Sequence, residues 1–134
     1  MKKYSINSMY KGRLNRKDFA LGFLIALVTL SIEVSLSTIG TRLISLSSGI
    51  AVFFGIAIWV ALIAYFVFFL YSLNVRRLHD IGYNGWWSLL LLVPIVGAFL
   101  FIYICVKKGI PITNEYGEVP QKRNFIKAVF NINK

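Results

Sequence analysis

The fold is decided by residues 50–73, which read IAVFFGIAIWVALIAYFVFFLYSL and contain no charged side chain. In a helix, these 24 residues would extend about 36 Å, enough to cross a bilayer core of about 30 Å with some tilt. Uncharged apolar runs of this length are typical of membrane-spanning helices. Residues 50–73 are therefore predicted to form one.

A second apolar run covers residues 19–39 and contains one acid, Glu33. It is longer than the core of a secretory signal, and no small-residue cleavage pattern follows it. We therefore expect a retained spanning helix. Asn15 with Asp18 three residues later predicts the helix start, because an asparagine caps free backbone N–H groups and an acid favours the positive end of the helix dipole.

The third apolar run, residues 86–106, is interrupted by Pro94 and Gly97, so a break or kink is expected there. Two arrangements stay open. A kinked full span fits the length but places the basic tail outside the cell. A re-entrant hairpin returns the tail to the cytoplasm, at a cost of several kcal/mol for each backbone group left unsatisfied. We favour the cytoplasmic tail.

The composition agrees with a membrane protein. Hydrophobic residues make up 57% of the 134-residue chain, which excludes a water-soluble monomer, and 16% are aromatic, which excludes intrinsic disorder. The predicted fold is an all-α polytopic membrane protein, one domain over residues 1–134 with a basic segment at 1–18 and a polar tail at 107–134. The single cysteine, Cys105, is expected to be a small buried hydrophobic residue.

The net charge of +10 gives the orientation. Six basic residues precede the first apolar run: Lys2, Lys3, Lys11, Arg13, Arg16 and Lys17. Arg42 alone lies in the first connection, whereas Arg76 and Arg77 open the second. Because basic residues accumulate on the cytoplasmic side, the N-terminus and the second connection are predicted to be cytoplasmic.

The tail carries a short amphipathic pattern. Its apolar face would hold Phe125, Ile126, Val129 and Phe130, and its basic face Lys122, Arg123 and Lys127. This pattern suits a short helix on an anionic membrane surface. Because the basic residues lie at membrane boundaries and match no nucleic-acid-binding motif, anionic lipid is the expected partner and nucleic acid is not.

The densest polar cluster comprises Arg76, Arg77, His79 and Asp80. It permits three interpretations: a phosphate headgroup site, a general base at His79 oriented by Asp80, or stop-transfer charge with pairing at a helix end. We favour the last for the arginines. Catalysis is disfavoured because neighbouring helical side chains diverge and no recognisable motif supplies a further catalytic group.

Other candidate residues lie within or beside the apolar runs. Glu33 permits two equal interpretations, an ion or proton step within the membrane or a side chain that extends to the outer interface and meets Arg42. Trp86 and Trp87 are expected to be interfacial anchors, with a ligand platform as the minor alternative. No metal or cofactor is expected, since the sequence contains no zinc-ligand cluster, Walker loop or dinucleotide fingerprint.

Three blocks of this sequence resemble a bacterial membrane family catalogued as domain of unknown function 805. They are residues 12–19 (GRLNRKDF), 76–87 (RRLHDIGYNGWW) and 109–120 (GIPITNEYGEVP). The sequence departs from the family pattern at Ile112, often glycine, and at Val119, often an acid. The resemblance implies a multi-pass bacterial inner-membrane protein with no established activity.

The family pattern concentrates its polar residues at Arg13, Arg16, Arg76, Arg77, His79 and Asp80. From this we predict that Asp80 bridges to Arg13 or Arg16 and so joins the entrance of the first helix to the exit of the second.

The sequence favours a binding or structural protein whose basic cytoplasmic rim contacts anionic lipid. A second copy of the chain or another membrane protein is the alternative partner. Two other functions stay open. One is a small transporter or channel component that uses Glu33 and the broken third segment, and the other is an enzyme that acts on a lipid headgroup through His79 and Asp80.

Overall fold

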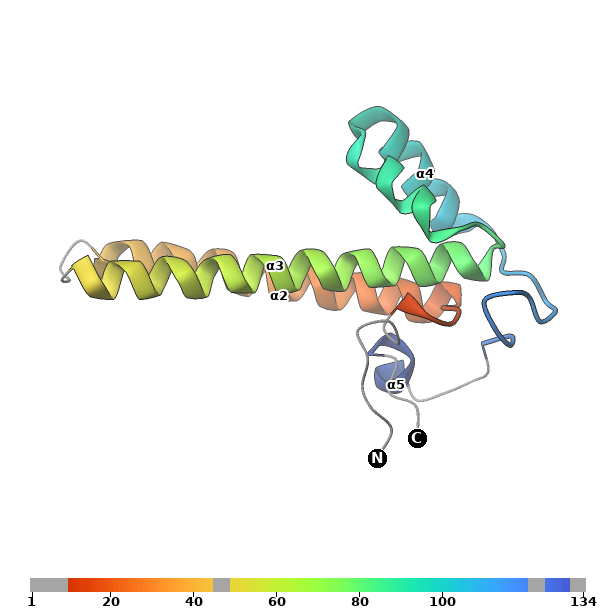
Figure 1. Cartoon of the computed structure of the whole chain (residues 1–134), viewed down its shortest axis with the longest axis horizontal. Coiled ribbons are helices and arrows are strands. Elements are labelled where there is room, and N and C mark those ends of the chain that lie inside the picture. The colour runs from red at the N-terminus through yellow and green to blue at the C-terminus, as the bar shows by residue number, and fades with distance from the viewer. Residues whose placement is uncertain (1–9, 45–48, 121–124, 131–134) are drawn as a thin grey trace. The chain divides into compact units, whose positions relative to one another are not determined.

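The computed structural model of the chain describes residues 10–44, 49–120 and 125–130 (Figure 1). Its elements are α2 (Arg16–Ile44), α3 (Gly49–Asp80), the 3₁₀-helix η1 (Gly85–Leu92), α4 (Pro94–Val106) and α5 (Phe125–Val129). Within these described ranges there is no strand, and an isolated bridge pairs Asn114 with Gly117. The predicted all-helical class is confirmed.

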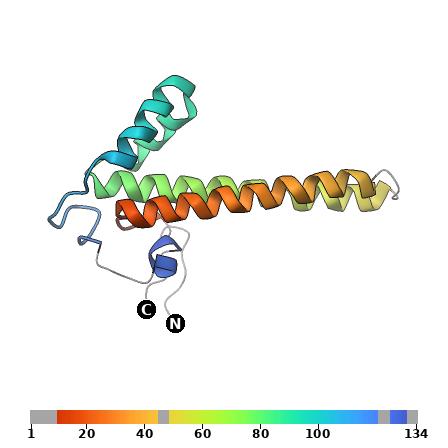
Figure 2. The same ribbon diagram turned by 180° about the vertical axis from the view of Figure 1, so that it is seen from behind.

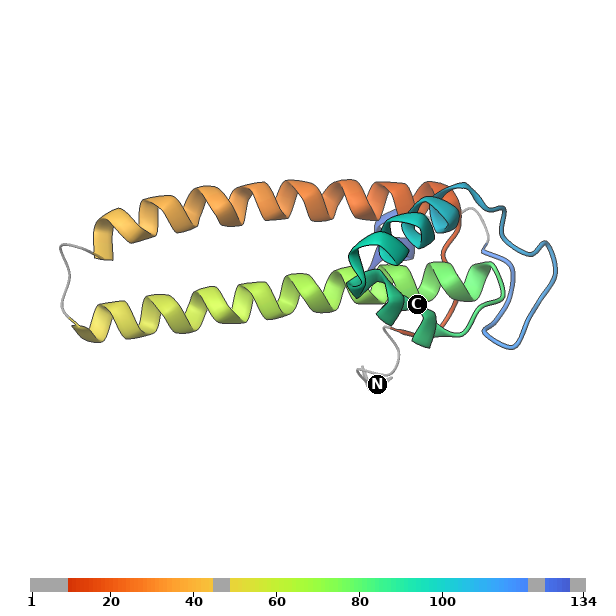
Figure 3. The ribbon, with the colours of Figure 1, turned by 90° about the horizontal axis from the view of Figure 1, so that it is seen from above.

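The chain divides into two compact units. The first combines Met1–Phe23 with Tyr71–Lys134, and the second is Leu24–Leu70. The first unit therefore contains the start of α2, the end of α3 and everything that follows. In it, α5 lies beside the first turns of α2 (Figure 2). In the second unit, the remaining parts of α2 and α3 run in opposite directions (Figure 3).

The start of α2 follows the predicted cap. The Asn15 side-chain oxygen accepts a hydrogen bond from the Asp18 backbone N–H at 2.9 Å, and the Asn15 amide donates to the Asp18 carboxylate at 2.7 Å. The cap satisfies one of the backbone donors that an α-helix leaves free in its first turn.

Both long helices expose large apolar side chains over most of their length. Two stretches, Arg16–Gly40 and Val52–Asp80, are long and apolar enough to cross a membrane. Leu24 is 56% exposed, Phe53 69% and Phe54 60%. Continuous apolar surface of this extent is unfavourable in water and suits contact with lipid chains.

Helix α3 continues beyond the uncharged run to Asp80 and then ends in a Schellman motif. Gly82 adopts a φ of 86°, and its N–H donates to the His79 carbonyl at 3.2 Å. The Tyr83 N–H donates to the Leu78 carbonyl at 2.9 Å. This turn needs a left-handed residue, which glycine supplies without steric cost, and it leads the chain into η1.

The third apolar run is broken, as predicted. Helix η1 ends at Leu92, the backbone at Val93 is extended, and Pro94 opens α4 at a position where its missing N–H costs nothing. The chain reverses here, because the hydroxyls of Tyr83, before η1, and Tyr103, near the end of α4, lie 3.3 Å apart. Residues 86–106 therefore form a hairpin of two short helices instead of one continuous helix.

Helix α4 corrects the expectation for Cys105. The neighbouring Ile104 is fully buried, whereas the Cys105 side chain is exposed. Successive residues of an α-helix point about 100° apart, so burying Ile104 turns Cys105 away from the packed face.

Gly97 sets the closeness of the hairpin, because a Cβ at this position would lie 2.6 Å from the Leu91 carbonyl oxygen. We expect Gly97→Ala to destabilise the protein by about 1–3 kcal/mol, the usual cost of overpacking. Thermal unfolding in detergent measures this, with Gly49→Ala as the control, because its added Cβ meets nothing within 4 Å. Equal melting temperatures for the two variants would contradict a close η1–α4 contact.

The predicted tail helix corresponds to α5, which spans five residues. Val129 is 3% exposed and Ile126 is 49% exposed. Val129 packs against the protein, since a Cβ on Gly22 would lie 3.4 Å from its Cγ1 atom. The expected basic-face residues Lys122 and Arg123 lie outside the described residues.

Candidate functional site

The Asp80 carboxylate lies between two guanidinium groups. Arg13 Nε donates to Oδ1 at 3.1 Å, and Arg77 Nη1 donates to Oδ2 at 2.5 Å. The three side chains are nearly inaccessible: Arg13 is 1% exposed, Arg77 0% and Asp80 4%. Charge-assisted bonds of this kind are stronger than neutral ones and offset part of the cost of burying charge. The predicted bridge from Asp80 is confirmed for Arg13 and not for Arg16.

Arg13 also bonds to the backbone of the tail. Its guanidinium donates to the Ile112 carbonyl at 2.6 Å and to the carbonyl of Ile110. The Ile110 N–H in turn donates to the Asp80 carbonyl at 2.9 Å. The segment before α2, the end of α3 and the start of the tail are therefore joined by hydrogen bonds around one carboxylate.

Arg77 bonds to the C-terminal end of α4. Its Nε donates to the Ile104 carbonyl at 2.9 Å, and its Nη2 donates to the carbonyl of Lys107. Arg16 donates to the neighbouring Val106 carbonyl at 3.1 Å. The last carbonyls of a helix have no partner within it and carry the negative end of the helix dipole. The two arginines satisfy these carbonyls and neutralise that end of α4.

Arg76 bonds to α5 and not to Asp80. It donates to the carbonyls of Val129, at 2.8 Å, and Ala128, at the end of α5. Its Nε is buried without a hydrogen-bond partner among the described residues. Arg76 lies on another side of α3 from Arg77, because consecutive helical residues diverge. It therefore attaches α5 to α3.

His79 stacks on Tyr116, with ring centroids 3.9 Å apart and planes 2° from parallel. Its Nδ1 lies 3.3 Å from the Gly12 carbonyl oxygen. The Tyr116 hydroxyl hydrogen-bonds to Glu115, which raises the pKa of Tyr116 and keeps the phenol neutral. Asp80 meanwhile binds two arginines, so the hypothesised pair in which Asp80 orients His79 as a base is not formed here.

The basic side chains that the structure describes therefore divide into two groups. Arg13, Arg76 and Arg77 are buried and bond within the protein. The exposed group, which we call the basic rim, comprises Lys11, Arg16, Lys17, Lys107 and Lys108. Trp86 and Trp87 are also exposed in this unit, at 72% and 46%. The bonds that Arg76 and Arg77 form within the protein therefore disfavour a headgroup site at this pair.

Glu33 lies in the second unit and is half-buried in α2. Among the described side chains, no cation forms an ion pair with it. The expected contact with Arg42 involves a side chain outside the described part of the structure.

The part that the tail plays in this site could not be predicted from the sequence. Ile110 and Ile112 contribute carbonyl oxygens, which any residue could supply and which leave no sequence signal. Gly109 packs against Asp80, and an added Cβ would overlap the carboxylate. The 109–120 block is the sequence feature that could have indicated this role of the tail. In the structure its Tyr116 stacks on His79, and its Asn114 donates to the His79 carbonyl at 2.9 Å.

Two apolar helices of spanning length, with buried ion pairs at the end of α3, one of them to the segment before α2, are typical of a helical membrane protein. The chain belongs to the family described as protein of unknown function (DUF805), whose model matches residues 8–118. It is 32% identical to the inner membrane protein YhaI of Escherichia coli strain K12 over 113 residues, which cover 84% of this chain and 86% of that protein.

The inner membrane protein YhaH of the same strain is 35% identical over 51 residues, covering 38% of this chain. That match spans 42% of the length of YhaH. No solved structure matches the chain.

Proposed function

We propose that this protein is a multi-pass inner-membrane protein whose basic rim binds anionic lipid on the cytoplasmic side. In this proposal α2 and α3 cross the membrane, and the η1–α4 hairpin enters it from the cytoplasm and returns. The observation that carries the proposal is the division of the basic residues into a buried, internally bonded group and an exposed rim.

The bonds around Asp80 support a common side for the segment before α2 and the segment after α4. Arg13 precedes α2, Asp80 ends α3, and Ile110 follows α4, and the three are joined by hydrogen bonds. Groups in direct contact lie on the same side of a membrane. The positive charge before α2 and at the end of α3 favours the cytoplasmic side.

The dimensions of the hairpin support re-entry. At about 2.0 Å per residue, η1 with 8 residues extends about 16 Å. At about 1.5 Å per residue, α4 with 13 residues extends about 20 Å. Both are shorter than a bilayer core of about 30 Å. Helical hydrogen bonds satisfy most of their backbone groups, which lowers the cost that burial in lipid imposes.

The rim supplies the lipid contact. Each basic residue near an anionic membrane surface contributes about 1 kcal/mol, so several together give a selective interaction. Arg16 also caps α4, whereas Lys17, Lys107 and Lys108 are exposed and can be replaced without disturbing the buried ion pairs.

The test is thermal unfolding in zwitterionic micelles with and without added phosphatidylglycerol. We expect the lipid to stabilise the wild-type protein, and we expect the K17Q/K107Q/K108Q variant to lose about 3 kcal/mol of that stabilisation. The matched K17R/K107R/K108R variant keeps the charge and should keep the response. A glutamine variant that responds fully would refute the lipid-binding role of the rim.

A second function is favoured by the half-buried Glu33 within an apolar helix, because ionisable groups at membrane depth often serve ion or proton movement. Proton flux into liposomes that contain the wild-type protein, abolished in Glu33→Gln, would support transport. Flux equal to that of empty liposomes would eliminate it.

A further inference from the structure

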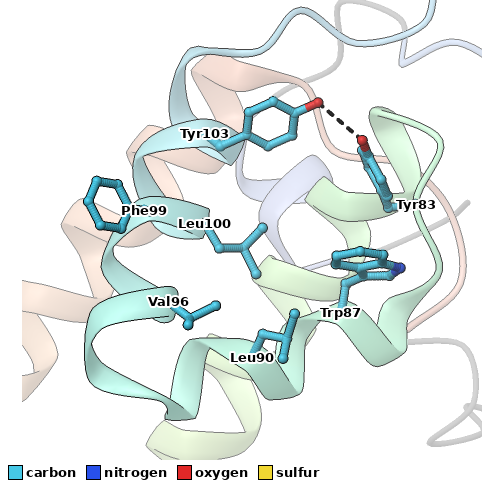
Figure 4. Close-up of a pocket in the computed structure, with 7 residues that line it drawn as sticks. All are labelled: Tyr83, Trp87, Leu90, Val96, Phe99, Leu100 and Tyr103. Carbon is cyan, nitrogen blue, oxygen red and sulfur yellow. Dashed lines mark hydrogen bonds between the residues drawn. The ribbon is translucent and has the colours of Figure 1, made fainter.

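An apolar groove runs between η1 and α4, with a volume of about 420 Å³ (Figure 4). Trp87 contributes one wall, and Val96 and Phe99 contribute to the other. The polar groups drawn at its lining are the indole nitrogen of Trp87 and the hydroxyls of Tyr83 and Tyr103, which hydrogen-bond to each other at one end. The groove is thus amphipathic along its length, with an apolar body and a phenolic end.

Positive charge lies at the phenolic end. The Lys107 ammonium is 5.8 Å from the centroid of the Tyr103 ring, and Lys108 follows it on the exposed surface. The hydrogen bond with Tyr103 raises the pKa of Tyr83, and one hydroxyl of the pair keeps a hydrogen that it can donate to a ligand. An elongated ligand with an apolar chain and an anionic head complements both ends. A second copy of this chain would bring the same positive charge to that end and be repelled.

The groove also matches the depth of a lipid in the proposed topology. Tyr83 belongs at headgroup level, where aromatic side chains collect, and Trp87 lies next to it along the groove. Helix α4 extends about 20 Å from there, slightly more than one leaflet of a bilayer core about 30 Å thick.

We propose that this groove binds an acyl chain of one anionic phospholipid, with the phosphate at Tyr83, Tyr103 and Lys107. This inference rests on the proposed topology and adds a defined site, with a stated lipid class, to the contact made by the rim.

Trp87 fluorescence tests the site. In the W59F/W86F variant Trp87 is the remaining tryptophan, and lipids with brominated acyl chains quench it on contact. We expect brominated phosphatidylglycerol to reach half-maximal quenching at about fivefold lower mole fraction than brominated phosphatidylcholine. That ratio corresponds to one basic residue beside a phosphate.

Two further variants, made in the W59F/W86F protein, distinguish recognition of the lipid headgroup from binding of the acyl chain. K107Q/K108Q, which alters exposed side chains, should remove the difference between the two lipids. Val96→Phe, which fills the groove, should reduce quenching by both, provided that its melting temperature matches the background protein.

Equal quenching by the two lipids in the parent variant, or unchanged quenching in a folded Val96→Phe variant, would overturn the groove site. If K17Q/K107Q/K108Q still loses its response to phosphatidylglycerol in micelles, the rim proposal survives that failure. Equal quenching by the two lipids, together with a K17Q/K107Q/K108Q variant that still responds fully in micelles, would refute both proposals.

Discussion

Asp80→Asn is expected to destabilise the protein by about 3–5 kcal/mol, the cost of leaving buried charge without its counter-ion. The substitution keeps the size of the side chain but leaves the Arg13 and Arg77 guanidiniums facing each other without an anion. Because Arg13 also bonds to the tail, the tail should loosen with it. Chemical unfolding in detergent, followed by tryptophan fluorescence, measures the change in free energy.

Glu118→Gln is the matched control, since it neutralises an exposed carboxylate and should change stability by less than about 0.5 kcal/mol. The Arg13→Gln/Asp80→Asn double variant should lose less than the sum of the two single changes, because the pair interacts directly. Equal stabilities for Asp80→Asn and Glu118→Gln would show that the ion pairs contribute nothing to folding.

Gly109→Ala is expected to have the second large effect. The added methyl group would overlap the Asp80 carboxylate, which two arginines hold from the other sides. Either the carboxylate moves away from Arg77 or the tail moves away from α3, and both weaken the hydrogen bonds around Asp80. We expect a loss of about 1–3 kcal/mol, measured by the same unfolding titration.

Gly40→Ala is the comparison for this change. Gly40 lies within α2, and its added Cβ would meet nothing within 4 Å, so alanine should be neutral or slightly stabilising there. Because the Asp80 carboxylate is the group displaced, Gly109→Ala should cost little in an Asp80→Ala background, which lacks the overlapped atoms. Full additivity of the two changes would show that Gly109 acts elsewhere.

The spanning-length helices could be predicted because uncharged apolar runs carry a strong signal. The cap at Asn15 and the break before Pro94 could be predicted because both depend on local backbone chemistry. Whether the third apolar run forms a kinked helix or a hairpin could not be predicted, since this depends on packing across the break at positions such as Gly97 and Leu91.

The candidate site was predictable at Arg13 and Asp80, whose charges need partners near the helix ends. The division of the arginines into a buried group and an exposed group could not be predicted, because it depends on which helix end each side chain reaches. Arg77 bonds to backbone carbonyls of α4, and Arg76 bonds to backbone carbonyls of α5. Every residue type has a backbone carbonyl, so the sequence does not show which carbonyls accept these bonds.

The side of the membrane on which the tail ends gives the most direct test. Two reporters are fused after Lys134: green fluorescent protein, which folds in the cytoplasm, and alkaline phosphatase, which is active in the periplasm. We predict fluorescent cells with the first and inactive phosphatase with the second, because the Arg13 bonds keep the tail beside the N-terminal segment. Active phosphatase with no fluorescence would mean that the third segment crosses the membrane and that the hydrogen bonds around Asp80 do not join one face.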